Sequence, residues 1–228
     1  MVYWLIDLLL IITLKMEEFS GEVRIRLYKY YDSRIDRKYK IDTLSVPETT
    51  YIPISTKILK LIFNEYIKIG NINFFDYGSG KGKALILASE LGAKHLGGIE
   101  WLSDLVEISK INLDTYKKIA GREIPFNIQH GDATLYKEID EYNVFLFNNT
   151  FGGNPSEVRM VAKVLNNIRG SLNRVYREIF IIYLHPVKNL QQLFDSYEWL
   201  ADKQVIRNKF EPRYNKALIY IFHIKGTK

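Results

Sequence analysis

Three glycines separated by single residues, Gly78, Gly80 and Gly82, stand in the stretch FFDYGSGKGKALILA, just after an apolar run that ends in Asp76. Glycine has no Cβ, so a backbone built this way can pass unusually close to a bound molecule. The residues that follow are apolar and helix-like, and a loop between a strand and a helix often holds a small ligand. The spacing is compatible with a phosphate, a dinucleotide or a sulfonium nucleoside.

Two established glycine patterns fit this loop poorly. The phosphate-binding P-loop needs a glycine where Tyr77 stands and a hydroxyl where Ala84 stands. The dinucleotide-binding pattern needs its third glycine three residues after the second, and Lys83 occupies that place. The pattern that does fit is an acid followed by glycines at alternate positions, at the carboxyl end of a predicted strand.

Polar residues also stand near the ends of the next three predicted strands. Glu100 ends the second strand, where a carboxylate can accept hydrogen bonds from sugar hydroxyls, and Trp101 follows it. Asp132 comes after the third strand in QHGDAT, and Asn148 stands at the end of the fourth in FLFNNTFGG. Carboxyl ends of parallel strands meet at one edge of a sheet, so these motifs are expected to surround a single crevice.

This set of motifs resembles the class I S-adenosylmethionine-dependent methyltransferases. The resemblance implies S-adenosyl-L-methionine as the cofactor and a Rossmann-like α/β fold: a seven-stranded, mostly parallel sheet of order 3-2-1-4-5-7-6, with strand 7 antiparallel and helices on both faces. In this family an acid orients the glycine loop or the cofactor's amino group, a second acid meets the ribose, and a third meets the adenine. The residues implied to bind the cofactor are Asp76, Gly78, Ser79, Gly80, Gly82, Glu100, Trp101, Asp132, Ala133 and Asn148.

A narrower similarity covers residues 34–187. DRKYKIDT, the glycine loop, FNNTFGG and IIYLHPV resemble a group of microbial methyltransferases, and NNTFG is similar to the non-SET histone lysine methyltransferases. In the latter a Tyr-containing loop closes over the cofactor and the asparagine-rich strand end lines the amine channel, which implies catalytic roles for Tyr51 and Asn148. The usual Glu-Thr-Ser of that loop is replaced by Pro53, Ile54 and Ser55, so the substrate is not carried across.

The composition suits a folded domain and excludes several kinds of site. With 47% hydrophobic residues in 228, the chain can build one large core. The absence of cysteine excludes disulfides, thiolate zinc sites and cysteine nucleophiles. The four histidines show no metal-ligand spacing with carboxylates, so we expect no metal. A net charge of +6 would help attract an anionic partner without implying one.

Strand-like apolar runs alternate with helical patterns along the chain. The patterns predict helices at residues 55–69, 103–119 and 155–168, the last with Asn154 as its cap and Pro155 in its first turn. Alternation of this kind predicts a parallel sheet covered on both faces. The predicted strands are residues 72–77, 95–100, 126–129, 143–147, 178–184 and 217–224.

We predict a boundary near residue 55, with residues 1–54 as an N-terminal extension and lid and residues 55–228 as the S-adenosylmethionine-binding methyltransferase domain. Residues 2–14 are nearly all apolar. As a helix they would span about 20 Å, less than the ~30 Å core of a bilayer. We expect them to pack on the domain or on a neighbouring subunit of a cytoplasmic protein. The alternative is association with a membrane surface.

Methyl transfer requires alignment of acceptor, methyl and sulfur more than it requires a strong base. An amine acceptor would be oriented by Asn148 with Tyr51 closing the lid, whereas a hydroxyl acceptor would need a base such as His185 or an acid of the N-terminal segment. The leading hypothesis is methyl transfer to an amine or hydroxyl of a protein lysine, a small molecule or a glycan. The alternatives are an RNA or DNA methyltransferase, which the basic, Tyr-rich residues 22–40 would suit, a non-catalytic S-adenosylmethionine-binding scaffold protein, and a nucleotide-dependent oxidoreductase.

Overall fold

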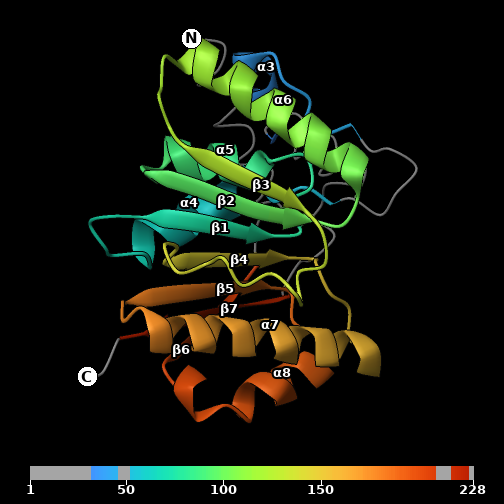
Figure 1. Ribbon diagram of the computed structural model, residues 1–228, viewed down its shortest axis with the longest axis vertical. Coiled ribbons are helices and arrows are strands. Elements are labelled where there is room, and N and C mark those ends of the chain that lie inside the picture. Colours follow the sequence, from blue (N-terminus) through green and yellow to red (C-terminus); the bar gives the residue numbers. More distant parts are fainter. Residues whose placement is uncertain (1–31, 46–51, 209–216, 226–228) are drawn as a thin grey trace, which may run out of the picture.

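The computed structural model describes residues 32–45, 52–208 and 217–225. Its centre is a seven-stranded sheet in the order β3-β2-β1-β4-β5-β7-β6 (Figure 1). The strands are β1 (Asn73–Tyr77), β2 (His95–Glu100), β3 (Phe126–His130), β4 (Val144–Asn148), β5 (Ile179–Leu184), β6 (Lys203–Arg207) and β7 (Leu218–Ile224).

Strand direction decides where the polar strand ends meet. Strands β1 to β5 are parallel to one another, and β7 runs antiparallel to both β5 and β6. The predicted strand order and the predicted antiparallel strand are both confirmed. Because β1 to β4 are parallel, their carboxyl ends lie along one edge of the sheet and bring the four polar motifs together.

Helices cover the sheet on both faces. Helices α3 to α6 share a core cluster on one face, and α7 and α8 share a second cluster on the other. Figure 1 shows α7 and α8 together on one side of the sheet, with α6 far from them beyond β3. The helices are α3 (Arg34–Tyr39), α4 (Thr56–Glu65), α5 (Lys83–Glu90), α6 (Ser103–Ala120), α7 (Pro155–Arg174) and α8 (Lys188–Asp195), with a short 3-10 turn at Glu198–Leu200.

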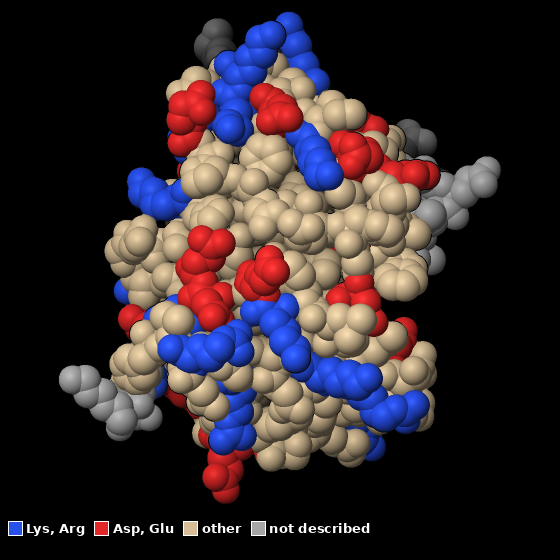
Figure 2. Space-filling model, in the orientation of Figure 1, with Lys and Arg blue, Asp and Glu red and all other residues tan. Residues whose placement is uncertain are grey.

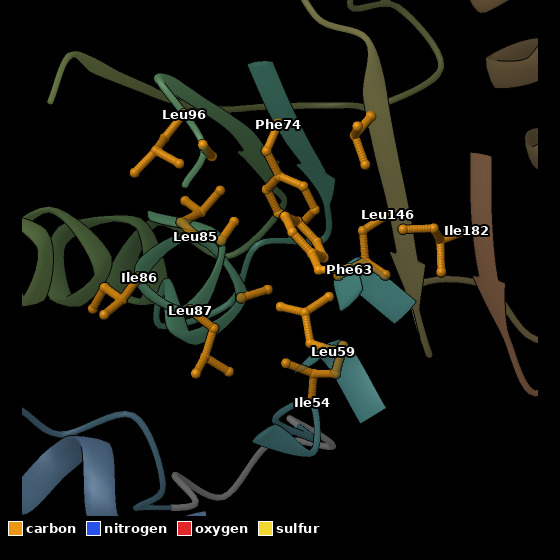
Figure 3. Packing of buried hydrophobic residues seen from close by; sticks show 14 of the residues in the cluster. Ile54, Leu59, Phe63, Phe74, Leu85, Ile86, Leu87, Leu96, Leu146 and Ile182 are labelled. Carbon is orange, nitrogen blue, oxygen red and sulfur yellow. The ribbon is translucent and has the colours of Figure 1, made fainter. Parts of the chain in front are cut away.

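The two core clusters follow from the alternation of side chains along each strand. In β1, Phe74 belongs to the cluster under α4 and α5, and the next residue, Phe75, belongs to the cluster under α7. Figure 3 shows Phe74 beside Leu59 and Phe63 of α4, with Leu146 of β4 next to them. The strands are therefore apolar on both faces, as expected of a buried parallel sheet.

The described part of the N-terminal extension packs on the α/β domain. Ile35, Tyr39 and Ile54 belong to the core cluster of α4 to α6, and the Tyr39 ring meets Tyr116 of α6 edge-on at 4.8 Å. The boundary near residue 55 stays a prediction. Residues 2–14 lie outside the described residues, and within the described ranges no helix is long and apolar enough to cross a membrane.

Several elements differ from the predicted ones for local reasons. Helix α7 begins as predicted, with the Asn154 side chain accepting from the backbone N–H groups of Ser156 and Glu157 at 3.0 Å, but it runs six residues further. Helix α4 ends early because the N–H of Ile67 bonds back to Ile62, five residues away. Strand β6 was not predicted; it is a mostly exposed edge strand, so its pattern is polar. Helix α8 was missed as well.

Candidate active site

The glycine loop turns the chain from β1 into α5. The backbone N–H groups of Gly78 and Ser79 both donate to the carbonyl of Ile99 in β2, at 2.8 and 3.1 Å. Gly82 caps α5 with a φ of +79°, and a Cβ there would lie 2.5 Å from Ser109 Oγ. The loop is thus held against α6, which explains why a side chain is excluded at Gly82.

Asp76 is a buried acid with an unsatisfied oxygen. Its side chain is 3% exposed, and its Oδ1 atom has no hydrogen-bond partner among the described residues. Burial, with a smaller contribution from the Glu100 charge, raises the pKa of Asp76 well above its ordinary value. A carboxyl kept in this position is suited to a cationic or hydrogen-bond-donating ligand.

Glu100 joins the end of β2 to the glycine loop. Its Oε2 accepts from the N–H of Gly80 at 2.9 Å, and its Oε1 accepts from the N–H of Leu102 at 3.0 Å. Each carboxylate oxygen has about two acceptor sites, so both can take a further donor such as a sugar hydroxyl.

A cavity of about 450 Å³ opens between these strand ends and the N-terminal segment. Tyr51 lies outside the described residues, and Gly80 and Gly82 support the loop without lining the cavity. The other predicted site residues line it together: Asp76, Gly78, Ser79, Glu100, Trp101, Asp132, Ala133 and Asn148.

The loops after β2 and β3 form the outer wall. Trp101 is 69% exposed at this wall, and its backbone carbonyl contacts His130 Nε2 at 2.9 Å. Asp132 Oδ1 accepts from the N–H of Thr134 at 2.8 Å, which fixes the carboxylate at the cavity. An aromatic face beside an acid can receive a flat base that carries an amino group.

Asn148 connects the end of β4 with the N-terminal segment. Its Nδ2 donates to the carbonyl of Ile52 at 2.9 Å, so its amide oxygen is turned toward Asn149 Nδ2, 3.4 Å away. Asn149 has a φ of +54°, a left-handed conformation that asparagine tolerates. Thr150 then donates to the carbonyl of Tyr77, and Phe151 lines the cavity.

Sequence reasoning missed several cavity residues. Glu157 and Met160 come from the first turns of α7, and Ile52, Pro53 and Ile54 come from the segment before α4. The Asn154-x-x-Glu157 capping pattern marks the start of α7 in the sequence, and Glu157 Oε2 accepts from the N–H of Asn154 at 3.2 Å. The short connection from β4 to α7 is the signal that could have placed this helix start at the strand ends.

The two lysines of the glycine loop anchor it to the N-terminal segment. Lys83 is buried in an ion pair with Asp32, whose other oxygen accepts from the N–H of Thr56 at 2.8 Å. Lys81 pairs with Asp42 at 3.0 Å, and its Nζ also bonds Ser45. Residues 32–45 therefore hold the loop through two ion pairs.

None of the described histidines lines the cavity, although His130 contacts the Trp101 carbonyl at its outer wall. His185 Nε2 accepts from Asn208 Nδ2 at 2.9 Å, and burial lowers the pKa of His185 to about 4. His95 and His223 pair with Glu141 and Glu178, at 2.9 and 2.5 Å. Among the described residues, no group of three potential ligands could hold a metal ion.

The similarity of this chain to known proteins is found in the structure and not in the sequence. No protein-family model matches the sequence, and no similar sequence was found among curated proteins. A protein from Pyrococcus horikoshii provisionally assigned as an RNA methyltransferase shares 15% identity at a TM-score of 0.52, covering 85% of this chain and 97% of that one.

Two further solved structures have a similar fold. A ribosomal protein L11 methylase from Lactobacillus delbrueckii shares 14% identity at a TM-score of 0.53, covering 78% of this chain and 83% of that one. An RNA methyltransferase from Salinibacter ruber in complex with S-adenosyl-L-homocysteine shares 16% identity at a TM-score of 0.51, covering 78% and 96%. With the strand order described above, these likenesses show that the chain has the fold of the class I S-adenosylmethionine-dependent methyltransferases.

Proposed function

We propose that this protein is an S-adenosylmethionine-dependent methyltransferase. The observation that carries the proposal is the Asp76 carboxyl, whose Oδ1 has no hydrogen-bond partner among the described residues. It lines the same cavity as Glu100 and Asn148, at the ends of three neighbouring strands. This arrangement offers acceptors for a charged amino group and for sugar hydroxyls beside a polar residue suited to a second substrate. The S-adenosyl-L-homocysteine bound to the Salinibacter ruber neighbour supports the choice of cofactor.

The cavity residues suit that cofactor chemically. Asp76 would take the amino group of the methionine part, Glu100 the ribose hydroxyls, and Asp132 with Ala133 and Trp101 the adenine. The cofactor supplies a methyl group on a positively charged sulfur. Carboxylates in a partly enclosed cavity favour that positive charge, which supports a cation over a phosphate-bearing ligand.

Asn148 is the residue we propose to orient the acceptor. Its amide oxygen can accept an N–H from an amine nitrogen, whose lone pair then points at the methyl carbon. The nitrogen–carbon bond forms as the carbon–sulfur bond breaks, the bonding pair leaves with sulfur, and the extra proton goes to solvent. Closure by Tyr51 stays a prediction, because Tyr51 lies outside the described residues.

A nitrogen acceptor is favoured over a hydroxyl acceptor. A hydroxyl needs a base to remove its proton, and neither His185 nor a described acid of the N-terminal segment lines the cavity. The His185 ring instead bonds Asn208. The cavity carboxylate of Glu157 already accepts from the N–H of Asn154. An amine can attack as the neutral nucleophile, so it needs orientation more than deprotonation.

Two classes of methyl acceptor are candidates: protein amines, small molecules or glycans on the one hand, and RNA on the other. The sequence placed protein amines, small molecules and glycans ahead of nucleic acid. The structural neighbours include a ribosomal protein methylase and, twice, RNA methyltransferases, so an RNA acceptor is at least as well supported. A non-catalytic scaffold protein would bind the same cofactor but show no turnover.

The test is transfer of a labelled methyl group from S-adenosylmethionine to RNA, protein or glycan fractions of the source cell. We expect one fraction to be labelled by the native protein. Asn148→Ala should slow transfer by on the order of 100-fold, because an orienting hydrogen bond is lost, while S-adenosylhomocysteine affinity stays within about twofold. Equal loss of binding and transfer would place Asn148 in the cofactor site. No labelling by a protein that binds the cofactor would favour the scaffold alternative.

A further inference from the structure

The outer face of α7 is basic and runs up to the cavity. The helix carries four cations and a single acid, Glu157, in 20 residues. We propose that this face binds the phosphate backbone of single-stranded RNA and presents an unpaired base to the cavity. The proposal rests on the proposed methyltransferase function and names the acceptor class.

Three of the four cations are available for an outside partner. Arg159, Lys163 and Arg169 are exposed, and none has an ion pair within the part of the chain that the structure describes. The fourth, Arg174, is paired with Asp140 at 2.7 Å. Figure 2 shows the blue side chains gathered over the position of α7, with few red ones among them.

The position of these cations links them to the cavity. Glu157 and Met160 line the cavity, and Arg159 stands between them in sequence. Lys163 follows one turn later and Arg169 lies about 15 Å from Arg159 along the helix axis, at a rise of 1.5 Å per residue. A polyanionic chain lying along α7 would therefore reach the cavity mouth at the amino end of the helix.

The negative charge of the cavity keeps the phosphate backbone of the RNA outside and admits an uncharged base. Carboxylates line the cavity, and Lys83 in its wall is already paired with Asp32. A phosphate is therefore repelled from the cavity and attracted to α7, whereas an uncharged base with an amino group meets acceptors inside. Phe151 in the cavity wall offers an aromatic surface for such a base, while Trp101 is left for the adenine of the cofactor.

This division of charge fits RNA better than an acidic protein. The carboxylates of an acidic peptide would be repelled by the same cavity that must receive its methylated side chain. Unpaired nucleotides carry their negative charge only on the backbone and can turn the base away from it. The exocyclic or ring nitrogen of that base is the atom that Asn148 would orient.

The experiment compares two charge-matched triple variants. Arg159→Glu, Lys163→Glu and Arg169→Glu together reverse the α7 face. Lys60→Glu, Lys94→Glu and Lys118→Glu reverse three exposed lysines on α4, before β2 and on α6, with the same change in net charge. Binding of a fluorescently labelled single-stranded RNA is followed by anisotropy over a range of salt concentrations. S-adenosylhomocysteine affinity is measured by calorimetry in each protein.

We expect the α7 variant to bind RNA at least about tenfold more weakly than the native protein, and the control variant to stay within about threefold of it. The slope of log affinity against log salt should become less steep by about 2, since each phosphate contact on a single strand contributes about 0.7. Labelling of RNA by methyl transfer should fall with binding, and S-adenosylhomocysteine affinity should not change.

Equal losses of RNA affinity in the two triple variants would attribute RNA binding to net charge. This result would overturn the proposal that the α7 face is the RNA-binding surface. If a protein fraction is labelled, and labelled equally by the native protein and the α7 triple variant, the RNA acceptor is overturned. The methyltransferase proposal would then remain intact. Failure of the native protein to bind S-adenosylhomocysteine would count against the proposed function, and the RNA affinities of the two variants would still test the surface.

Discussion

Asp76 is a buried carboxyl that the described residues leave with an unsatisfied oxygen. A buried polar atom without a partner costs about 1–3 kcal/mol, and native structures contain few of them. Burial, and then the charge of Glu100, raise the pKa of Asp76, so the charged form is disfavoured without a positively charged neighbour. A bound ammonium group would remove both costs.

Asp76→Asn tests this reading with a neutral side chain of the same shape. We expect S-adenosylhomocysteine affinity to fall by about 30- to 100-fold, which corresponds to about 2–3 kcal/mol for a charge-assisted hydrogen bond. The urea midpoint should stay the same or rise, because the amide avoids burial of an acid. Calorimetry and urea unfolding give the two values, and a folded variant with native affinity would remove Asp76 from the site.

The same residue predicts a pH dependence of binding. The pKa of Asp76 is raised in the free protein, and a nearby ammonium group would lower it. Binding should therefore release a proton when the pH is below the free-protein pKa, and affinity should rise with pH until that value is passed. Calorimetry in buffers of different ionisation enthalpy detects the released proton, which should be absent in Asp76→Asn.

At the residue scale, the sequence predicts the strand-end side chains well and the rest of the cavity poorly. Asp76, Glu100, Asp132 and Asn148 stand beside predicted strand ends, and parallel pairing alone brings such positions together. Glu157 reaches the cavity because α7 begins soon after β4 ends at that edge of the sheet, a consequence of topology that the side-chain pattern of α7 alone does not report. The individual binding roles remain predictions.

At the scale of elements, the segment of residues 32–45 is attached to the glycine loop by buried charge. Lys83 and Asp32 are 1% and 2% exposed, so neither ion is stabilised by water. Asp32 also holds the first N–H of α4, which joins three elements through one carboxylate. Loss of either partner leaves a buried charge without its counter-ion.

Lys83→Met and Asp32→Asn test that attachment as a double-mutant cycle. We expect each single change to reduce the free energy of unfolding by about 3–5 kcal/mol, and the double change to cost clearly less than the sum. Urea unfolding of the full-length variants measures the three differences. Strictly additive losses would mean that the two side chains are stabilised independently, and the attachment would have to come from other contacts.

Element prediction succeeded where the pattern was apolar and failed where it was not. Strands β1 to β5 and β7 were predicted within one residue at each end. Most of them contain a run of apolar residues, and in β3 the apolar Phe126 and Ile128 alternate with polar residues, which is also a strand pattern. Edge strand β6 and the short helix α8 were missed, since partial exposure leaves polar residues in both patterns. The early end of α4 depends on one backbone bond from Ile67, which no side-chain pattern reports.

At the scale of the whole molecule, the strand order determines where the cavity lies but does not determine which methyl acceptor it serves. The same fold in the compared structures serves a ribosomal protein methylase and RNA methyltransferases. In this chain, carboxylates line the cavity, whereas the exposed Arg159, Lys163 and Arg169 on the outer face of α7 have no ion pair among the described residues. The modest net charge of +6 does not reveal that separation, which requires the fold.

The most direct test of the central claim is calorimetric titration of the full-length protein with S-adenosyl-L-homocysteine. We predict saturable binding of one molecule per chain in the micromolar range or tighter, with release of a proton when the pH is below the pKa of Asp76 in the free protein. Absence of binding by a protein whose circular dichroism and cooperative unfolding show an intact fold would contradict the claim, and the Asp76 cavity would then require a different ligand.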